Sequence, residues 1–270
     1  TRFEDEHKHP MNIDSMTADD LRVFADFLSS DYDISMNTIV TNMTLMRTVC
    51  SWVRKQGVTN NDPFFGYDMP KALYGTPYFL TIQERDQVLD ADLTDDAELA
   101  EYRDMFVFQC MVGCRHSDLV TFTPKNIIDG VLEYIPIKTK GKLGDVVRVP
   151  LIPKAMAILD GHDHGDDEPI FPKHYNFKFN DAIRRILKRA KVNRVVTVIN
   201  PKTRLEEKKP ISDVATSHLA RRTFIGNLYR MVKDPDLVAS MSGHAKGSVA
   251  FARYRVIDDD MKKSLVELIQ

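Results

Sequence analysis

Cysteine is scarce in this 270-residue sequence, which contains only Cys50, Cys110 and Cys114. An odd number of cysteines without a CxxC spacing supports neither a disulfide framework nor a zinc site. No hydrophobic run approaches the roughly 20 residues that a membrane-spanning helix needs. The charged stretch from Thr1 to Pro10 lacks the apolar core of a secretory signal. These absences predict a soluble cytoplasmic protein with reduced thiols and no bound metal ion.

An excess of positive charge is also lacking, because the formal net charge is −2. The charges are nevertheless unevenly distributed. Between Lys173 and Lys209, twelve lysines and arginines stand against three acidic residues, whereas between Glu84 and Asp104 nine acidic residues stand against two arginines. Two solvated helix faces of opposite sign would explain both runs. The alternative for the basic run is a track for the phosphates of a nucleic acid.

Apolar periodicity predicts a mainly α-helical chain with a small β component. A first helix is expected to begin within residues 16–20. A second begins near Ser35 and has an apolar face that comprises Ile39, Met43, Met46, Val49, Trp52 and Val53. Three prolines and two glycines between Asn60 and Tyr78 indicate a linker. The predicted domains are therefore residues 1–76 and residues 77–270.

The second domain is expected to alternate helices with a few short strands. Thr81 and Glu84 form a capping-box pattern at its start. Helices are predicted at residues 82–92, 97–112, 153–160, 177–190, 216–230, 234–241 and 258–269. Residues 131–137 and 145–149 predict a β-hairpin with Lys138 near its end, and residues 194–209 predict a second, polar hairpin.

Six residues in the last two thirds of the chain have the chemistry needed to cleave a phosphodiester without a metal ion. In chain order they are Arg115, Lys138, His218, Arg221, His244 and Tyr254. Taken singly, each has a structural explanation, such as a solvated arginine or a half-buried tyrosine. The ordered set of two guanidiniums, a lysine, two imidazoles and a late tyrosine favours one active site.

With these residues, the second domain resembles the catalytic domain of the tyrosine recombinases, the phage integrase family. The segments that carry the resemblance are Gly113–Leu119, Ile137–Lys140, Ser217–Phe224, Ser242–His244 and Arg253–Tyr254. Tyr254 follows His244 by ten positions, where the family pattern has nine, and an additional residue in the intervening loop would account for the difference. The helical domain at residues 1–76 is similar to the family's SAM-like core-binding domain.

The resemblance implies a role for each of the six residues. Arg115 and Arg221 would bind the scissile phosphate, and Tyr254 would attack it to form a 3′-phosphotyrosine. His218 would accept the proton of the tyrosine, and His244 would bind a phosphate oxygen or help to orient the nucleophile.

The resemblance also implies a general acid and a supporting carboxylate. Lys138 would protonate the leaving 5′-oxygen, with Lys140 and Lys142 on the same hairpin as alternatives. Asp118 would orient the guanidinium of Arg115. No metal ion or nucleotide cofactor is needed for this chemistry.

The expected function is site-specific DNA recombination, as the integrase of a mobile element. A resolvase or topoisomerase-like enzyme is the alternative within the same chemistry, and a DNA-binding regulator with a vestigial site is the alternative of another class. Double-stranded DNA is the expected partner, with tetramer formation through the C-terminal helix and with accessory DNA-bending proteins as potential partners. The missing initial methionine and the short helical domain predict a fragment without an N-terminal arm-binding domain.

Overall fold

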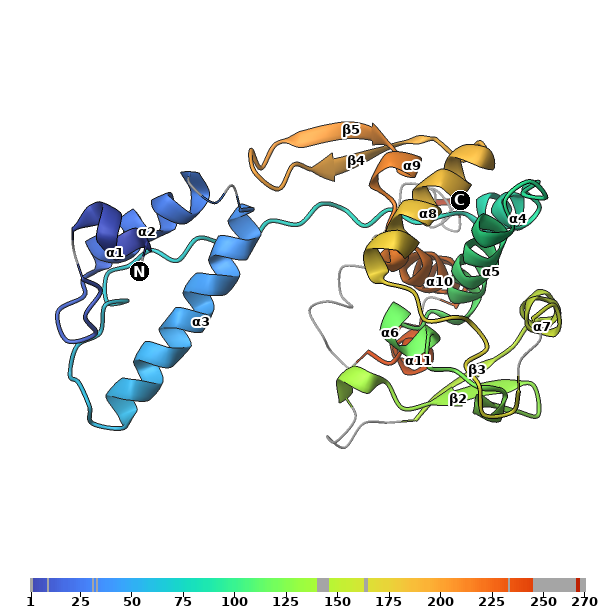
Figure 1. The fold of residues 1–270 in the computed structure, drawn as a ribbon, viewed down its shortest axis with the longest axis horizontal. Coiled ribbons are helices and arrows are strands. Elements are labelled where there is room, and N and C mark those ends of the chain that lie inside the picture. Colours follow the sequence, from blue (N-terminus) through green and yellow to red (C-terminus); the bar gives the residue numbers. More distant parts are fainter. Residues whose placement is uncertain are drawn as a thin grey trace. The chain divides into compact units, whose positions relative to one another are not determined.

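The computed structural model describes residues 2–8, 10–30, 32, 34–139, 146–162, 165–232, 234–244 and 266–267. Two compact units make up the chain (Figure 1). The first comprises Thr1–Gly75 and Thr197–Glu207, and the second comprises Thr76–Val196 and Lys208–Gln270. Across the described residues, no helix combines the length and the apolar character that crossing a membrane requires.

Three helices form the first unit, and side chains define where two of them begin. They are α1 (Arg2–His7), α2 (Ala18–Ser30) and α3 (Met36–Lys55). Before α2, the Thr17 amide donates to Asp20 Oδ2 at 2.8 Å, and the Asp20 amide donates to Thr17 Oγ1 at 3.3 Å. The Ser35 hydroxyl accepts the Thr38 amide at 3.2 Å, which caps α3 as the sequence predicts.

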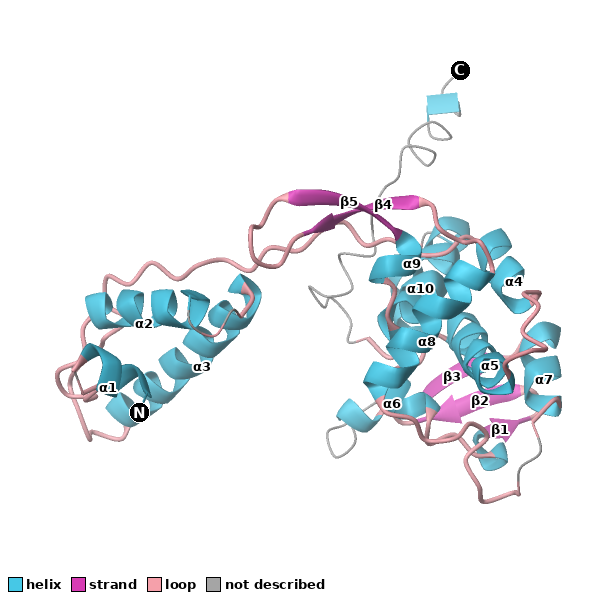
Figure 2. Ribbon diagram, turned by 45° about the horizontal axis from the view of Figure 1, so that its top comes forward, coloured by secondary structure: helices cyan, strands magenta, loops and turns pink. Residues whose placement is uncertain are grey.

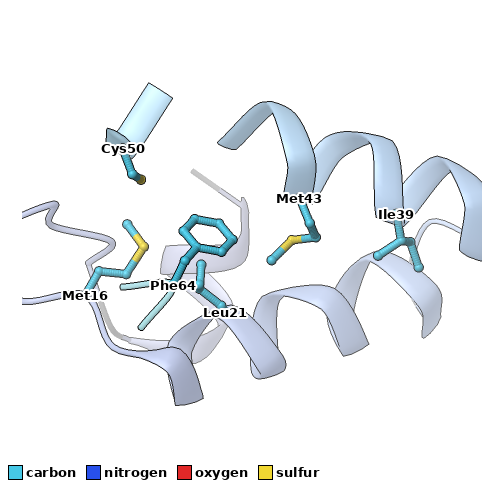
Figure 3. Packing of buried hydrophobic residues seen from close by; sticks show 6 residues of the cluster. All are labelled: Met16, Leu21, Ile39, Met43, Cys50 and Phe64. Atoms are coloured by element: carbon cyan, nitrogen blue, oxygen red, sulfur yellow. The ribbon is translucent and has the colours of Figure 1, made fainter. Parts of the chain in front are cut away.

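The core of the first unit lies between α2, α3 and the segment after α3 (Figure 3). Its buried residues are Met16, Leu21, Ile39, Met43, Cys50 and Phe64. The prediction that Val49 and Trp52 share this apolar face is wrong, since they are 49% and 61% exposed. Cys50 is the inward residue of that turn, and each residue of an α-helix is rotated by about 100° from the one before. Val49 and Trp52 therefore lie on the exposed side of α3.

The second unit is mainly helical. Its helices are α4 (Ile82–Leu89), α5 (Ala97–Val112), α6 (His116–Leu119), α7 (Pro153–Asp160), α8 (Asn176–Arg189), α9 (Ile211–Val214), α10 (Ser217–Val232) and α11 (Pro235–Ser242). The predicted capping box is confirmed, because the Glu84 amide donates to Thr81 Oγ1 at 3.1 Å and the Thr81 amide donates to Glu84 Oε2 at 2.9 Å. The helix predicted at 97–112 is confirmed at both ends. The single-turn helices α6 and α9 were not predicted.

Helix α5 lies at the centre of this unit and packs against α4, α8 and α10 (Figure 2). All residues from Met105 to Val112 are buried, including Gln109. The segment that leads into α4 is held to α10 as well. The Leu80 amide donates to Thr223 Oγ1 at 3.0 Å, and Asn227 donates to the Leu80 carbonyl at 2.9 Å. Helix α10 is therefore fixed on both sides.

Two small antiparallel sheets accompany these helices. The first has the order β1 (Ile127–Ile128), β2 (Val131–Tyr134) and β3 (Val147–Pro150), with Leu132 opposite Val149. Short 3-10 helices, η1 (Pro124–Asn126) and η2 (Ile137–Thr139), flank β1 and β2. The second sheet pairs β4 (Val195–Ile199) with β5 (Glu206–Pro210). Both predicted hairpins are confirmed, and β1 is an additional strand.

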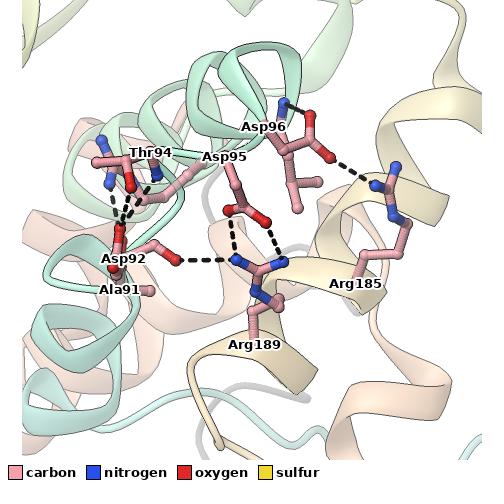
Figure 4. A network of polar contacts seen from close by, with 9 residues as sticks. Ala91, Asp92, Thr94, Asp95, Asp96, Arg185 and Arg189 are labelled. Carbon is pink, nitrogen blue, oxygen red and sulfur yellow. Dashed lines mark hydrogen bonds and ion pairs between the residues drawn. The ribbon is translucent and has the colours of Figure 1, made fainter.

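The acidic and basic runs of the sequence meet where α8 packs beside the start of α5 (Figure 4). Arg185 contacts Asp96 at 2.7 Å, and Arg189 contacts Asp95 at 2.5 Å. The hydrogen bond from Arg189 lowers the pKa of the Asp95 carboxyl. Further ion pairs are Lys154–Asp86, Lys188–Asp213 and Arg194–Glu84. The predicted solvated faces of opposite sign therefore lie against each other at α8, where carboxylates of the acidic run pair with its exposed arginines.

Candidate active site

Helix α5 ends in a sharp turn at Gly113, whose φ of +68° lies in the left-handed region. Glycine adopts this conformation without strain. A Cβ at this position would stand 2.2 Å from Cδ1 of Phe224 on α10, so a side chain is also excluded sterically. The Gly113 amide donates to the Gln109 carbonyl at 2.9 Å and closes α5. Cys114 is then buried, and Arg115 is the first polar side chain after the turn.

Arg115 occupies the N-terminal boundary of α6 with an extended backbone, at φ −78° and ψ 153°. Its Nη1 atom is buried, and no residue in the described part of the chain accepts a hydrogen bond from it. Leaving a charged donor buried and unpaired costs free energy. This guanidinium is therefore suited to an anionic oxygen supplied from outside the protein.

Asp118 is 1% exposed, and its carboxylate binds a different segment from the one that the sequence predicts. Its Oδ1 atom accepts the backbone amide of Ile137 at 2.9 Å. Its Oδ2 atom, like Nη1 of Arg115, has no hydrogen-bond partner among the described residues. The prediction that Asp118 orients the Arg115 guanidinium is wrong. Asp118 instead anchors the chain immediately before Lys138.

Lys138 lies in η2 and is exposed. Its positive charge is one of the influences that lower the pKa of His218, which places the two side chains within electrostatic reach of each other. The predicted position between the two strands of a hairpin is confirmed. The alternatives Lys140 and Lys142 lie outside the described residues.

Arg221 is 3% exposed and comes from the second turn of α10. Its Nη1 atom donates to the Gly113 carbonyl at 2.7 Å. The carbonyl belongs to the same turn that precedes Arg115. The residue that ends α5 therefore fixes the guanidinium that α10 contributes.

His244 follows Gly243, which ends α11 in the left-handed region at φ +63°. The Nη2 atom of Arg221 lies 3.0 Å from Nδ1 and 3.2 Å from Nε2 of His244. Ser242 Oγ is 2.9 Å from Nδ1. Burial, followed by the charges of Arg221 and Arg115, lowers the pKa of His244 to about 3. The imidazole is therefore neutral at pH 7 and can accept a hydrogen bond from Arg221.

His218 lies in the first turn of α10. Desolvation of its imidazole lowers its pKa, and four cations add to the effect: Arg222, Arg221, Arg115 and Lys138. Neutral imidazole is the form that can take up a proton. His218 is thus held in the state required of a general base.

A cavity of about 330 Å³ is lined by Arg115, His218 and Arg221. It joins the turn after α5 to the first two turns of α10. His244 lies beside this cavity, since it contacts Arg221, one of the lining residues. Tyr254 lies outside the described residues, as does most of the helix predicted at 258–269. The structure therefore brings together four of the six predicted residues, and Lys138 is near enough to His218 for its charge to act on the imidazole.

Other residues that line this cavity were not predicted. They are Gln109, Cys114, His116, Ser117, Asn176 and Ser217. Gln109 donates to the Cys114 carbonyl at 3.0 Å, and so supports the turn before Arg115. Asn176 comes from α8, 41 positions before Ser217. No periodic or local signal in the sequence connects residues so far apart.

The cysteines of this region have the chemistry of core residues. Burial raises the pKa of both the Cys110 and the Cys114 thiol, so that neither forms a thiolate at neutral pH. Within the described ranges, no group of three or more His, Cys, Asp or Glu side chains is arranged to hold a metal ion. Arg115 and Arg221, which line the cavity, are cationic groups that can neutralise a bound phosphate.

Comparison with known proteins identifies the family. The sequence profile of the phage integrase family matches residues 78–261. No curated protein matches the sequence. Among solved structures, the chain is similar to the Tn1549 transposon integrase (residues 82–397) in complex with circular intermediate DNA. That similarity has a TM-score of 0.69 and 17% identity, and it covers 98% of this chain and 89% of the other.

Two further solved structures show the same fold. A λ integrase (residues 75–356) dimer bound to a COC′ core site has a TM-score of 0.65 and 14% identity, with 96% of this chain and 87% of the other covered. The XerH recombinase bound to its difH substrate has a TM-score of 0.62 and 15% identity, with 100% and 76% covered. The family profile spans most of the chain, and the fold agrees with it. The chain therefore belongs to the phage integrase family and is a tyrosine-type site-specific DNA recombinase.

Proposed function

We propose that this recombinase cuts and rejoins DNA strands through a 3′-phosphotyrosine at Tyr254, as the integrase of a mobile element. The observation that carries the proposal is the buried, unpaired Nη1 of Arg115, on a residue that shares a cavity with His218 and Arg221. An unpaired cationic donor beside a neutral imidazole suits a phosphodiester that gains negative charge during attack. The N-terminal unit would serve as the core-binding domain that holds the DNA.

In the proposed site, the two arginines bind the non-bridging oxygens of the scissile phosphate. Guanidinium groups can do so with two parallel hydrogen bonds, which also fixes the orientation of the phosphate. Arg221 reaches the phosphate from a position fixed by the Gly113 carbonyl. Neutral His244 would hold Arg221 from the other side or bind a phosphate oxygen.

In the cleavage step, the Tyr254 oxygen forms a bond to phosphorus while the bond from phosphorus to the 5′-oxygen breaks. His218 takes up the phenolic proton, for which its lowered pKa keeps the imidazole neutral. Lys138 gives a proton to the departing 5′-oxygen. The 5′-hydroxyl of a second strand then attacks the phosphotyrosine, and each proton returns. The phosphodiester energy is conserved, so resealing needs no ATP, and the two arginines would stabilise the charge that a metal ion stabilises in other phosphoryl-transfer enzymes.

The partner of this reaction is double-stranded DNA. The Tn1549 integrase and the λ integrase are both seen in complexes with DNA, and the latter as a dimer. We propose a tetramer on DNA, connected through the C-terminal helix, as the assembly that exchanges strands in the cytoplasm. Accessory DNA-bending proteins would help to shape the recombining site.

A trapped covalent intermediate tests the nucleophile. Binding sites are first selected from a randomised duplex library, and the selected duplex is then nicked so that the cleaved strand end diffuses away. In EDTA, the wild-type protein should give a covalent protein–DNA band on a denaturing gel. Tyr254→Phe should bind the same duplex and give no band.

Tyr229→Phe is the matched control, because the Tyr229 hydroxyl makes no hydrogen bond to any residue the structure describes. It should cleave as the wild type does. A wild-type protein that binds the duplex and forms no covalent band would contradict the enzymatic proposal and favour the regulator. Relaxation of a supercoiled plasmid without joining of two sites would favour the topoisomerase-like alternative.

A sulfur substitution identifies the general acid. A DNA strand with sulfur in place of the 5′-bridging oxygen leaves as a thiolate, which needs no proton from the enzyme because a thiol is far more acidic than an alcohol. Lys138→Ala should cleave normal DNA slowly and the sulfur-containing strand at nearly the wild-type rate. Lys140→Ala and Lys142→Ala should not show this difference. If Lys140→Ala or Lys142→Ala shows this rescue by sulfur and Lys138→Ala does not, the lysine replaced in that variant is the general acid.

A further inference from the structure

The first turns of α8 touch both halves of the candidate active site. On one side, the Phe179 ring stacks on His116, the neighbour of Arg115, with the ring centroids 5.0 Å apart. On the other side, α8 meets Ser217, the neighbour of His218. Figures 1 and 2 show α8 beside α5 and α10, with which it packs. Phe179 is fully buried, so this end of α8 is anchored in the core.

Two asparagines, one turn apart on α8, bind the same residue of α10. Asn180 Oδ1 accepts the Ser217 amide at 2.8 Å, and Asn176 Oδ1 accepts the Ser217 hydroxyl at 3.3 Å. The residue before α10, Thr216, has a hydroxyl group that could cap the helix. Among the described residues, that hydroxyl makes no hydrogen bond, and only the Thr216 carbonyl accepts one, from the Leu219 amide at 2.8 Å. The capping group of α10 is therefore supplied by another helix, 37 positions earlier in the chain.

We propose that Asn176 and Asn180 are positioning residues that fix the first turn of α10, and through it His218 and Arg221, relative to Arg115. This inference rests on the proposed function. Ser217 is 5% exposed, and the next residue along the helix is His218. Without the Asn180 cap, the first turn of α10 would fray, and the imidazole would lose its fixed distance from the phosphate. Asn180 contributes more to this positioning than Asn176 does, because its hydrogen bond to Ser217 is shorter and holds the backbone amide.

Cleavage of pre-bound DNA tests the asparagine pair. Asn180→Ala should lower the single-turnover cleavage rate on the order of 10-fold to 100-fold, since small displacements of catalytic groups have effects of that size. Asn176→Ala should lower it about 2- to 10-fold, the equivalent of one ordinary hydrogen bond. Affinity for DNA should stay within about 2-fold of wild type, because neither bond involves an arginine.

A conservative variant and a matched control separate positioning from folding. Asn180→Asp keeps an acceptor oxygen for the Ser217 amide, so it should restore most of the cleavage rate that Asn180→Ala loses. Asn193→Ala removes an exposed asparagine of the same unit whose side chain makes no hydrogen bond to a described residue. It should behave as wild type. Equal rates for Asn180→Ala and Asn193→Ala would overturn the proposal.

The titration of His218, followed by NMR on histidine-labelled protein, gives a readout without DNA. The charged groups that act on this imidazole are Arg115, Lys138, Arg221 and Arg222. A frayed first turn moves the imidazole away from these cations and into water, and both changes raise its pKa towards the ordinary value. Asn180→Ala should therefore raise the pKa of His218, and Asn193→Ala should not.

The two readouts keep this inference separate from the proposed function. If wild-type protein forms no covalent complex, the proposed function fails, and the NMR titration still decides whether Asn180 fixes His218. If wild-type protein cleaves DNA and the titration is the same in Asn180→Ala and Asn193→Ala, the positioning role is refuted. A loss of rate in Asn180→Ala that comes only from unfolding, with no recovery in Asn180→Asp, refutes it as well.

Discussion

Arg115 and Arg221 line one cavity but depend on the protein in different ways. Arg115 is partly exposed, and its Nη1 makes no hydrogen bond to a described residue, whereas Arg221 is buried and donates to Gly113. Lysine at either position cannot form the two parallel bonds of a guanidinium. Both Arg115→Lys and Arg221→Lys should therefore lower strand cleavage on the order of 10²- to 10³-fold.

The two variants should differ in stability. Arg115→Lys should leave the free energy of unfolding within about 0.5 kcal/mol of wild type. Arg221→Lys should lower it by about 1–3 kcal/mol, because the Gly113 carbonyl and His244 lose their donor. Urea unfolding followed by circular dichroism measures both values. Equal destabilisation by the two variants would show that Arg115 has a structural role of its own.

His244 makes the stability of the second unit depend on pH. Its pKa is about 3 in the folded protein and near 6.5 in an unfolded chain, so between these values only the unfolded state binds the proton. The contribution of His244 to the free energy of unfolding is therefore highest above pH 6.5. It decreases as the pH falls towards 3, by up to about 1.4 kcal/mol per pH unit.

The comparison that isolates this effect uses His244→Asn, which does not titrate and keeps an acceptor oxygen. Between pH 7.5 and pH 5, wild-type protein should lose more unfolding free energy in urea than the variant does. Parallel losses would mean that His244 is not held neutral by its surroundings.

At the scale of elements, Gly113 illustrates why the end of α5 tolerates one residue type. Gly113→Ala combines a strained backbone with a clash against Phe224, while Gly130→Ala at φ +74° meets no atom within 4 Å. Gly130→Ala should cost about 1–2 kcal/mol from the left-handed backbone. Gly113→Ala should cost about 1–3 kcal/mol more from overpacking. Thermal unfolding of the two variants measures the difference, and equal melting temperatures would contradict the steric argument.

Elements with local signals are the ones that the sequence predicts well. The capping box at Thr81 and Glu84 lies within one helical turn, and it correctly marks the start of α4. Helices α6 and α9 have a single turn each, which is too short for an apolar period to be visible. The sequence does not identify the buried face of α3, because apolar residues occur on two sides of this helix. Only packing selects the side of Cys50 over that of Val49 and Trp52.

In the candidate site, too, local sequence signals predict some features, and others depend on contacts between distant segments. The residue types, their order and the family resemblance are enough to select Arg115, His218, Arg221 and His244, which the fold brings to one place. The contacts that hold these residues are different in kind. The bond from Ile137 to Asp118 and the bonds from Ser217 to α8 join segments that no local pattern relates. Only the folded chain reveals them.

At the scale of the whole molecule, the small net charge raises the question of how DNA would be held. Ion pairs with Asp95 and Asp96 occupy Arg189 and Arg185, so these arginines are poor candidates for contacts with phosphate. Each phosphate contact contributes about −0.9 to the slope of log affinity against log salt. The double variant Arg185→Gln/Arg189→Gln should therefore change this slope by less than about 1, as measured by fluorescence anisotropy. A slope that is weaker by about 2 would place both arginines on the DNA.

The first unit is discontinuous in sequence, since residues 197–207 belong to it together with residues 1–75. Within this unit, Arg204 donates to the Lys71 carbonyl at 3.0 Å, and the Met36 amide donates to the Pro201 carbonyl at 3.2 Å. A gene divided after the codon for Gly75 would therefore not yield two complete units. The shorter product would lack part of its own structure, and the longer product would carry a hairpin tip deprived of its packing partners. Exchange of the first unit between relatives would require two crossovers, one in the linker and one in the hairpin.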